Sequence, residues 1–192
     1  MEEHHILIEN IKRSGLLSDG EAQEICKHFR KEDIRKNQFF LEEGKRCSKI
    51  GFLEFGILCT FVYSWAGEEV VKYFVEDRQF FTDMESYENA TPASLNIIAV
   101  VNSRVWSITK SQNEQLQSEI PNWQHALNFF AAEALNRMIQ NQHFLKMGEA
   151  SDQYKHFLKN HPNLARWVPL RYIASYLGIT QSSLSRLRRE VL

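Results

Sequence analysis

Cysteine is scarce in this sequence of 192 residues. Its three cysteines, Cys26, Cys47 and Cys59, are widely spaced and form no CxxC pair. Structural zinc sites and disulfide frameworks need cysteines in even numbers or at short, regular spacings, so neither is predicted. We expect three reduced, partly buried thiols in a reducing compartment.

Long apolar runs are absent too. No stretch of about 18 apolar residues occurs that could form a membrane-spanning helix. The first residues, Met1 to His5, lack the basic and apolar segments of a signal peptide. Hydrophobic residues make up 43% of the chain and charged residues 24%, which is ordinary for a globular protein. The sequence therefore predicts a cytoplasmic protein that does not contact a membrane.

Catalytic signatures are missing as well. The sequence contains no GxSxG, P-loop or GxGxxG motif, and its histidines form neither HxH nor HExxH. A small antiparallel barrel can be a cupin, whose metal is held by His and carboxylate side chains on strands. None of the histidines falls in a predicted strand; they are His4, His5, His28, His125, His143, His156 and His161. We predict that the protein is not an enzyme and holds no metal or cofactor.

A net positive charge, which would suit a nucleic-acid-binding protein, is also lacking, because the formal net charge is −1. The charge is unevenly distributed, however. Residues 153–192 hold seven Lys and Arg against Glu190 alone, a local charge of +6, so the rest of the chain carries −7. This distribution predicts that only the C-terminal part meets phosphates. The seven basic residues are Lys155, Lys159, Arg166, Arg171, Arg186, Arg188 and Arg189.

The most informative stretch runs from Pro169 to Arg189 and predicts two short helices joined by a tight turn. Gly178 stands where a helix ends on a residue that tolerates positive φ, and Thr180 can cap the next helix. Ile179 can fill the space between the two helices. The apolar residues at helical spacing are Ile173, Ala174, Leu177, Leu184 and Leu187. The pattern is typical of a helix-turn-helix, whose second helix enters the major groove of DNA.

The outer face of the second helix is basic and rich in hydroxyl groups. At about 100° per residue, this face lies opposite the apolar stripe. Arg can pair with guanine, Gln with adenine, and Ser with a base or a phosphate. The predicted DNA-binding residues are Thr180, Gln181, Ser182, Ser185, Arg186, Arg188 and Arg189. The alternative is a helical hairpin whose basic face is merely solvated.

The N-terminal part changes from helical to strand periodicity. Residues 4–13 and 18–29 have apolar residues at helical spacing, and Ser18 with Glu21 forms a capping-box pattern. Short alternating segments follow at residues 33–41, 49–55, 57–64, 69–75, 95–101 and 104–108. Many short strands at regular spacing predict an antiparallel barrel or sandwich. The fold class is therefore α+β.

Helices return after the strands. Residues 110–119 predict a short helix, and Pro121 suits the first turn of a long one that runs to about residue 147. The apolar stripe of the long helix is wide enough to cover the barrel on one side and face a partner helix on the other. We favour a dimerisation helix over a helix buried wholly within one chain. Residues 148–151 predict a hinge before the C-terminal module.

The order of these parts resembles the Crp/Fnr superfamily of bacterial transcription regulators. The run from Arg166 to Arg186 carries the resemblance most specifically, and the match covers essentially the whole chain. It implies a cyclic-nucleotide-binding-like effector domain with a jelly-roll (double-stranded β-helix) barrel over residues 1–120. It also implies a dimerisation helix over 121–148 and a helix-turn-helix domain over 149–192. By position in the family, Gln181, Ser182 and Arg186 would contact bases.

The sequence departs from the family in the segment that binds a cyclic phosphate. Asp83 stands where the resemblance places a ribose-binding Glu, and Ala93 stands where it places a phosphate-binding Arg. Between Thr82 and Ser94 there is no Lys or Arg, and Asp83, Glu85 and Glu88 would repel a phosphate. We predict that cyclic AMP does not bind in the family manner. The candidate effector pocket is placed at Asp83 and Ser94, with an unknown small-molecule effector.

Taken together, the residues and the resemblance predict a homodimeric transcription regulator that reads a palindromic operator in double-stranded DNA. The alternative is a ligand-sensing or adaptor protein that acts through protein–protein contacts. In that case the C-terminal helical hairpin would be only structural. The two functions differ in salt dependence, because phosphate contacts weaken steeply as salt rises.

Overall fold

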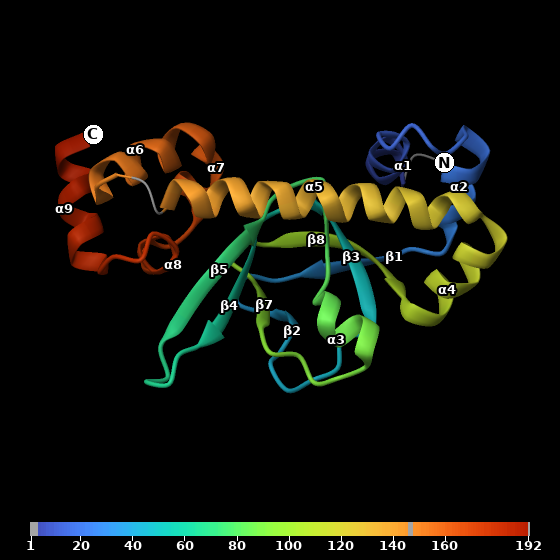
Figure 1. The fold of residues 1–192 in the computed structure, drawn as a ribbon, viewed down its shortest axis with the longest axis horizontal. Coiled ribbons are helices and arrows are strands. Elements are labelled where there is room, and N and C mark those ends of the chain that lie inside the picture. Colours follow the sequence, from blue (N-terminus) through green and yellow to red (C-terminus); the bar gives the residue numbers. More distant parts are fainter. Residues whose placement is uncertain (1–3, 146–147, 192) are drawn as a thin grey trace.

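The computed structural model describes residues 4–145 and 148–191. Helices lie at both ends of the chain and strands in the middle (Figure 1). The helices are α1 (His5–Lys12), α2 (Asp19–Lys27), α3 (Met84–Asn89), α4 (Lys110–Glu119), α5 (Pro121–Leu145), α6 (Ala150–Asn160), α7 (Pro162–Trp167), α8 (Leu170–Tyr176) and α9 (Gln181–Val191). The strands are β1 (Arg30–Ile34), β2 (Phe39–Leu41), β3 (Lys49–Phe55), β4 (Leu58–Tyr63), β5 (Glu69–Val75), β6 (Gln79–Phe81), β7 (Asn96–Ala99) and β8 (Ser103–Thr109).

The strands form two antiparallel sheets of jelly-roll type. Sheet A has the order β1-β8-β3-β6 and sheet B the order β2-β7-β4-β5. The prediction of a mixed fold of helices and antiparallel sheet is confirmed, as is its jelly-roll type, but the two sheets are not closed into a barrel. Most consecutive strands change sheet instead of pairing with their predecessor, and no ladder in the described ranges joins the edges of sheet A to those of sheet B. Positive φ angles at Asn37, Gly56 and Arg78 turn the chain at three of these changes.

Those changes of sheet explain where the predicted strands differ from the observed ones. Residues 33–41 were predicted as one strand, yet β1 ends at Ile34 in sheet A and β2 begins at Phe39 in sheet B. The prediction also lacks β6, α3 and α7, because each is at most six residues long and is held by packing instead of by a repeated pattern. The predicted helix over residues 110–119 has the observed bounds of α4. The predicted end of the long helix, at residues 146–147, lies outside the described residues.

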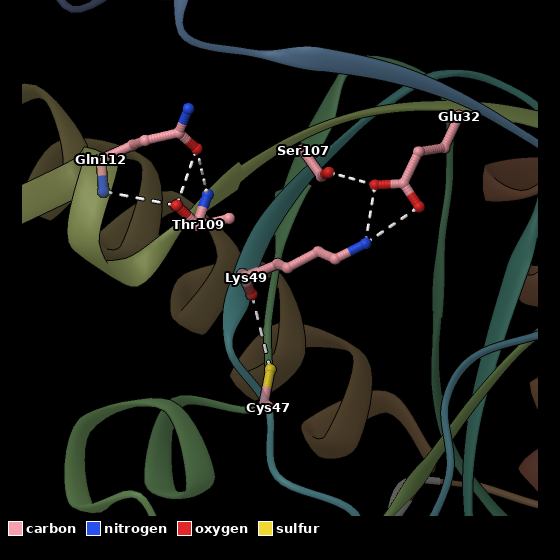
Figure 2. Close-up of polar contacts among 6 residues, drawn as sticks. All are labelled: Glu32, Cys47, Lys49, Ser107, Thr109 and Gln112. Atoms are coloured by element: carbon pink, nitrogen blue, oxygen red, sulfur yellow. Dashed lines mark hydrogen bonds and ion pairs between the residues drawn. The ribbon is translucent and has the colours of Figure 1, made fainter.

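Two helices begin at capping boxes. The Glu21 N–H donates to Ser18 Oγ at 3.3 Å, and the Ser18 N–H donates to Glu21 Oε2 at 2.8 Å, which confirms the predicted start of α2. Thr109 and Gln112 make the same reciprocal pair at the start of α4 (Figure 2). These bonds fix the residues at which α2 and α4 begin.

Polar side chains also tie the strands of sheet A together on the face that turns towards sheet B, where Lys49 Nζ lies 5.8 Å from the centre of the Phe40 ring of β2. The Lys49 ammonium on β3 donates to both carboxylate oxygens of Glu32 on β1, at 2.8 and 3.0 Å. Ser107 on the intervening strand β8 donates to the same carboxylate (Figure 2). The contacts run diagonally across the sheet, because Glu32 is in register with Val105 and Lys49 with Thr109, and they link β1, β8 and β3.

The main core fills the space between the two sheets and beneath the N-terminal half of α5. Phe52 and Leu53 on β3 are fully buried, and Trp123, Ala126 and Phe130 of α5 belong to the same cluster, in which the Phe80 ring of β6 contacts Phe52, Trp123 and Phe130. Gly51 lets the Phe81 ring of β6 lie directly against β3, because a Cβ at that position would collide with the ring. The prediction that one side of the long helix covers the strands is therefore confirmed.

A second core lies on the opposite face of sheet B. Cys59 and Phe61 of β4 pack there against Tyr154, Phe157 and other buried residues of helices α6–α9, which we call the C-terminal module. Sheet B is thus buried on both faces. The long helix α5 crosses the molecule, with α1, α2 and α4 near one end and the C-terminal module at the other (Figure 1). None of the described helices combines the length and apolar character needed to cross a membrane.

Candidate functional site

The C-terminal module ends in two helices joined by a tight turn. Gly178 has a φ of +68°, so the turn uses the conformation that glycine adopts without strain. The Ser183 N–H donates to Thr180 Oγ1 at 3.1 Å, which caps α9 as the sequence predicts. Leu184 is fully buried and packs with Ile173 of α8. The apolar stripe therefore holds α9 against the module, and α9 contacts α6 as well as α8.

The face of α9 opposite its buried apolar stripe is accessible to solvent. Gln181, Ser182, Arg186, Arg188 and Arg189 are exposed, as is Thr180, and Ser185 is half-buried. No ion pair between these arginines and any residue of the described segments is present. All seven Lys and Arg of residues 153–192 are exposed. The structure thus brings the predicted residues together on one accessible surface, which we call the α9 face.

Two of the basic residues outside α9 lie on aromatic rings. The Arg166 guanidinium is 4.9 Å from the centre of the Trp167 ring, and Trp167 is 56% exposed. The Arg171 guanidinium lies 4.5 Å from the Tyr172 ring and donates to the Tyr172 hydroxyl at 2.8 Å. These contacts hold the guanidinium groups in place while leaving both arginines accessible.

The long helix α5 has an apolar stripe that no described residue covers. Leu135 is 57% exposed and Ile139 46% exposed. Together with Asn128, Ala132 and Gln142, which are also exposed, they recur at alternating spacings of four and three residues. That spacing puts all five on one face of the helix, away from Trp123 and Phe130. This is the spacing at which apolar residues pair helices in coiled coils, and three of the five residues are apolar.

A cavity of about 590 Å³ lies between β5, β6, α3 and α5. Aromatic and aliphatic side chains form most of its lining, including Tyr73, Phe80 and Met138. A buried chain of hydrogen bonds borders it, in which Trp123 Nε1 donates to Asn113 Oδ1 at 2.9 Å and Asn113 Nδ2 donates to the Tyr87 hydroxyl at 3.1 Å. These bonds connect α5, α4 and α3, so they hold the walls of the cavity together. We call this space the α5 cavity.

Asp83 lines the α5 cavity and is only 5% exposed. Its Oδ1 accepts the Ser86 N–H at 3.1 Å and so caps α3, whereas its Oδ2 has no hydrogen-bond partner among the residues described. Burial raises the pKa of the neighbouring Tyr73 phenol to about 12, and the Asp83 charge acts in the same direction. Tyr73 therefore stays uncharged at neutral pH.

The other predicted effector residue, Ser94, lies elsewhere. It is exposed and does not line the cavity, and Ala93 beside it is 3% exposed. Arg46 pairs with Pro92 through an isolated backbone bridge, but its side chain is exposed and also does not line the cavity. Lys110 donates to the carbonyls of Tyr87 and Glu88, at 2.8 and 2.9 Å. Among the lining residues described, Arg137 on α5 is the one Lys or Arg.

Comparison with known proteins shows what this chain is similar to. Residues 31–119 match the family model of the cyclic nucleotide-binding domain. Comparison with curated proteins finds no match. The structure of FixK2 from Bradyrhizobium japonicum is similar with a TM-score of 0.71 and 17% identity over 85% of this chain and 84% of that one. The fold of this chain is that of the Crp/Fnr regulators.

Two further structures support the Crp/Fnr fold. CLP from Xanthomonas campestris, described as a c-di-GMP-responsive global regulator, gives a TM-score of 0.73 with 12% identity and 91% coverage of both chains. A transcriptional regulator of the Crp/Fnr family from Eubacterium rectale gives 0.70 with 15% identity, covering 91% of this chain and 83% of that one. At these identities the likeness concerns the fold, so the chemistry must come from this chain's own residues.

Sequence reasoning missed the contacts through which the parts of this Crp/Fnr fold meet. His161 Nδ1 lies 2.9 Å from Glu76 Oε1, joining the C-terminal module to the end of β5. His161 and Glu76 also line the α5 cavity. Neither residue stands in a recognisable motif, and 85 positions separate them in the sequence. One sequence signal existed for the strand β6, which the prediction also missed. The Phe80-Phe81 pair is apolar and could have indicated a buried strand at this position.

The three cysteines are free and buried. Burial raises the pKa of the Cys26 thiol to about 12 and raises that of Cys59 further. Both thiols are thus protonated at neutral pH and poorly nucleophilic, which is the behaviour of structural cysteines. No group of three or more metal-ligating side chains that could hold an ion occurs in the described ranges.

Proposed function

We propose that this protein is a dimeric, sequence-specific DNA-binding transcription regulator of Crp/Fnr type that does not respond to cyclic AMP. In this proposal residues 1–120 form the effector domain, 121–148 the dimerisation helix and 149–192 the DNA-binding domain. The observation that carries it is the α9 face, an exposed surface of Gln, Ser and Arg side chains set opposite a buried stripe. Such a face is what a recognition helix presents to the major groove.

The distribution of charge also supports DNA binding through the C-terminal module. The local charge of +6 in residues 153–192 sits on side chains that are all exposed, while the rest of the chain carries −7. The acidic remainder would repel the DNA backbone, so productive encounters are confined to the C-terminal module. Arg186, Arg188 and Arg189 keep their full capacity to donate to bases or phosphates, because no described carboxylate pairs with them.

Dimerisation follows from the uncovered stripe of α5. A chain that leaves Leu135 and Ile139 exposed at coiled-coil spacing buries them when two copies pair along that stripe. A two-fold axis along α5 would bring two C-terminal modules into symmetric positions. The two α9 helices would then enter successive major grooves about 34 Å apart, so the operator would be palindromic.

The lack of a response to cyclic AMP follows from the charges around the α5 cavity. A buried cyclic phosphate needs a guanidinium and free N–H donors. Ala93 supplies no charge at the position where the family resemblance places an arginine, and Asp83, Glu76 and Glu88 give the cavity lining an acidic character. The effector, if the cavity takes one, is therefore a different molecule.

Selection of DNA by the full-length protein tests the proposed function. Binding to a pool of random duplexes, followed by sequencing of the bound fraction, is expected to enrich a palindrome whose half-sites are about 10 base pairs apart from centre to centre. A variant with Arg186→Ala and Arg189→Ala should enrich nothing. Enrichment of an asymmetric single site would contradict the dimer, and no enrichment by the unaltered protein would contradict DNA reading altogether.

A further inference from the structure

We propose that the α5 cavity binds a mainly apolar organic molecule whose cationic or neutral hydrogen-bond donor reaches Asp83. Anionic ligands, including phosphate esters, are excluded at that end. The inference deepens the proposed function, because it names the chemical class of the effector. The binding of such a ligand, however, can be measured without any DNA.

The size and lining of the cavity set the apolar part of the ligand. A volume of about 590 Å³ lies within the range of roughly 300–1,000 Å³ that small-molecule sites occupy. Phe80 lies on one wall, with its ring centre 4.9 Å from that of Phe130, and Leu127, Ala134 and Met138 of α5 lie on another. Apolar rings and chains gain most from leaving water for such a surface.

Asp83 determines the polar group that the ligand must carry. A buried carboxylate oxygen without a donor is costly, because it has lost its water and gained nothing in return. Oδ1 is already used by the Ser86 N–H, whereas Oδ2 has no partner among the described residues. An ammonium, amide N–H or hydroxyl of a ligand would supply the missing bond. A carboxylate or phosphate would instead bring like charges together.

Towards the C-terminal module, two of the polar lining residues are already paired. Glu76 and His161 line that end, but they contact each other at 2.9 Å. Leu164 and Tyr176 of the C-terminal module complete the lining there. The favoured ligand therefore carries its donor at the Asp83 end and apolar groups towards the C-terminal module.

Arg137 is the competing feature, because it is the one Lys or Arg among the described lining residues. It is half-buried on α5, and no ion pair joins it to Asp83. An anionic ligand held by Arg137 would reverse the charge preference that Asp83 imposes. The two possibilities therefore predict opposite orders of affinity for ligands that differ only in charge.

Three matched probes test the proposal by calorimetry with the full-length protein. Naphthylmethylamine is cationic at neutral pH, naphthylmethanol is neutral and naphthoate is anionic, and all three share the naphthalene ring. The amine is expected to bind about ten-fold or more tightly than naphthoate, with the alcohol between them. Naphthoate binding as tightly as the amine would overturn the proposal in favour of Arg137, and so would failure of all three probes to bind.

Two carboxylate variants assign the preference to Asp83. Asp83→Asn keeps a side chain that can cap α3, so the fold is retained, but it removes the negative charge. It should abolish the preference for the amine and change naphthylmethanol binding by less than about three-fold. Glu85→Gln removes the same charge from an exposed position on α3 outside the cavity lining and should leave all three affinities unchanged. An amine preference that survives Asp83→Asn contradicts the assignment.

Variants that fill the α5 cavity test whether the probes bind inside it. Ala134→Phe places a ring in the α5 cavity and should weaken all three probes by about ten-fold or more, whereas unchanged binding would show that the probes bind elsewhere and overturn the proposal. If that variant does not fold, as judged by its thermal unfolding, Ala131→Leu at an exposed lining position replaces it. Because no DNA is present, failure here overturns the ligand class and leaves DNA binding to be judged by the selection experiment.

Discussion

The hydroxyl of Ser175 donates a hydrogen bond to the carbonyl of Glu69 at 2.8 Å, although 106 positions separate the two residues. The same Oγ accepts the Val71 N–H at 3.0 Å. Glu69 and Val71 lie on β5, an edge strand of sheet B, and Ser175 lies on α8. One side chain of the C-terminal module thus completes the hydrogen bonding of an open sheet edge, which both fixes the module and protects that edge.

Replacing Ser175 with Ala should loosen this connection. The variant leaves the Val71 N–H and the Glu69 carbonyl without their partner, at a cost of about 1–2 kcal/mol in the free energy of unfolding. Denaturant unfolding measures the cost, and faster amide hydrogen exchange at Val71 places it on β5. Ser118→Ala is the matched control, since that hydroxyl donates only to Gln115 O within α4. Equal losses in both variants would argue against the role of the edge contact.

Arg186→Ala is expected to reduce affinity for the selected operator by about 1–3 kcal/mol and to relax the preference at one base position in each half-site. The reason is that a bidentate Arg–guanine contact discriminates against the other bases. Fluorescence anisotropy with single-base operator variants measures both effects. Arg30→Ala, at an exposed position on β1, is the control for loss of one positive charge. Equal weakening on every sequence would reassign Arg186 to a phosphate.

Salt dependence separates DNA binding from the adaptor alternative. The logarithm of the binding constant should fall linearly with the logarithm of salt concentration, by about 0.9 per phosphate neutralised. Replacing Arg188 or Arg189 with Ala should reduce that slope by about 1 if the residue contacts a phosphate. A titration between low and physiological salt checks this. A shallow slope in the unaltered protein would favour a function through protein–protein contacts.

Leu135→Glu combined with Ile139→Glu should convert the proposed dimer to a monomer. The change places two charges per chain on the α5 stripe, where they would be desolvated and would repel their copies in the partner. Sedimentation equilibrium gives the mass directly, and operator affinity should fall because one half-site no longer supports the other. Gln140→Glu adds a charge at an exposed position on another side of α5 and should leave the dimer intact. A double variant that is still dimeric would move the interface away from this stripe.

Cyclic AMP is expected to show no binding at micromolar concentrations in calorimetry. The lining of the α5 cavity is acidic around Asp83, and Ala93 provides no guanidinium for the phosphate. Micromolar binding that Ser94→Ala weakens would contradict this prediction, because it would place the nucleotide in the family manner despite the missing arginine. Ser64→Ala, in the loop after β4, serves as the control.

Much of the fold was predictable because its signals are local. The helical spacing of Leu184 and Leu187, together with Gly178 and the Thr180 cap, predicts two helices and the turn between them without reference to distant residues. The capping box at Ser18 marks the start of α2 in the same way. The candidate DNA-contacting face follows from the same helical arithmetic, so its residues could be named in advance. Six of these seven residues are exposed in the structure, and Ser185 is half-buried.

The candidate effector site was predictable only in part. Asp83 was singled out from its position in the chain, and it lines the α5 cavity. Ser94 was singled out by the same reasoning, yet it is exposed and lies away from the lining. A cavity is bounded by elements that meet through packing, and the short segments β6 and α3 that form its wall carry too few residues for a periodic signal.

The sequence by itself determined most of the longer helices and strands, the basic character of the C-terminal part and the identity of the α9 face, because these depend on neighbours within one or two turns. The tertiary structure decided how the strands divide between two open sheets, that Asp83 Oδ2 is buried without a partner, and that the C-terminal module is docked on sheet B through Ser175. These features depend on residues far apart in the chain, and packing of the whole molecule selects which of them meet.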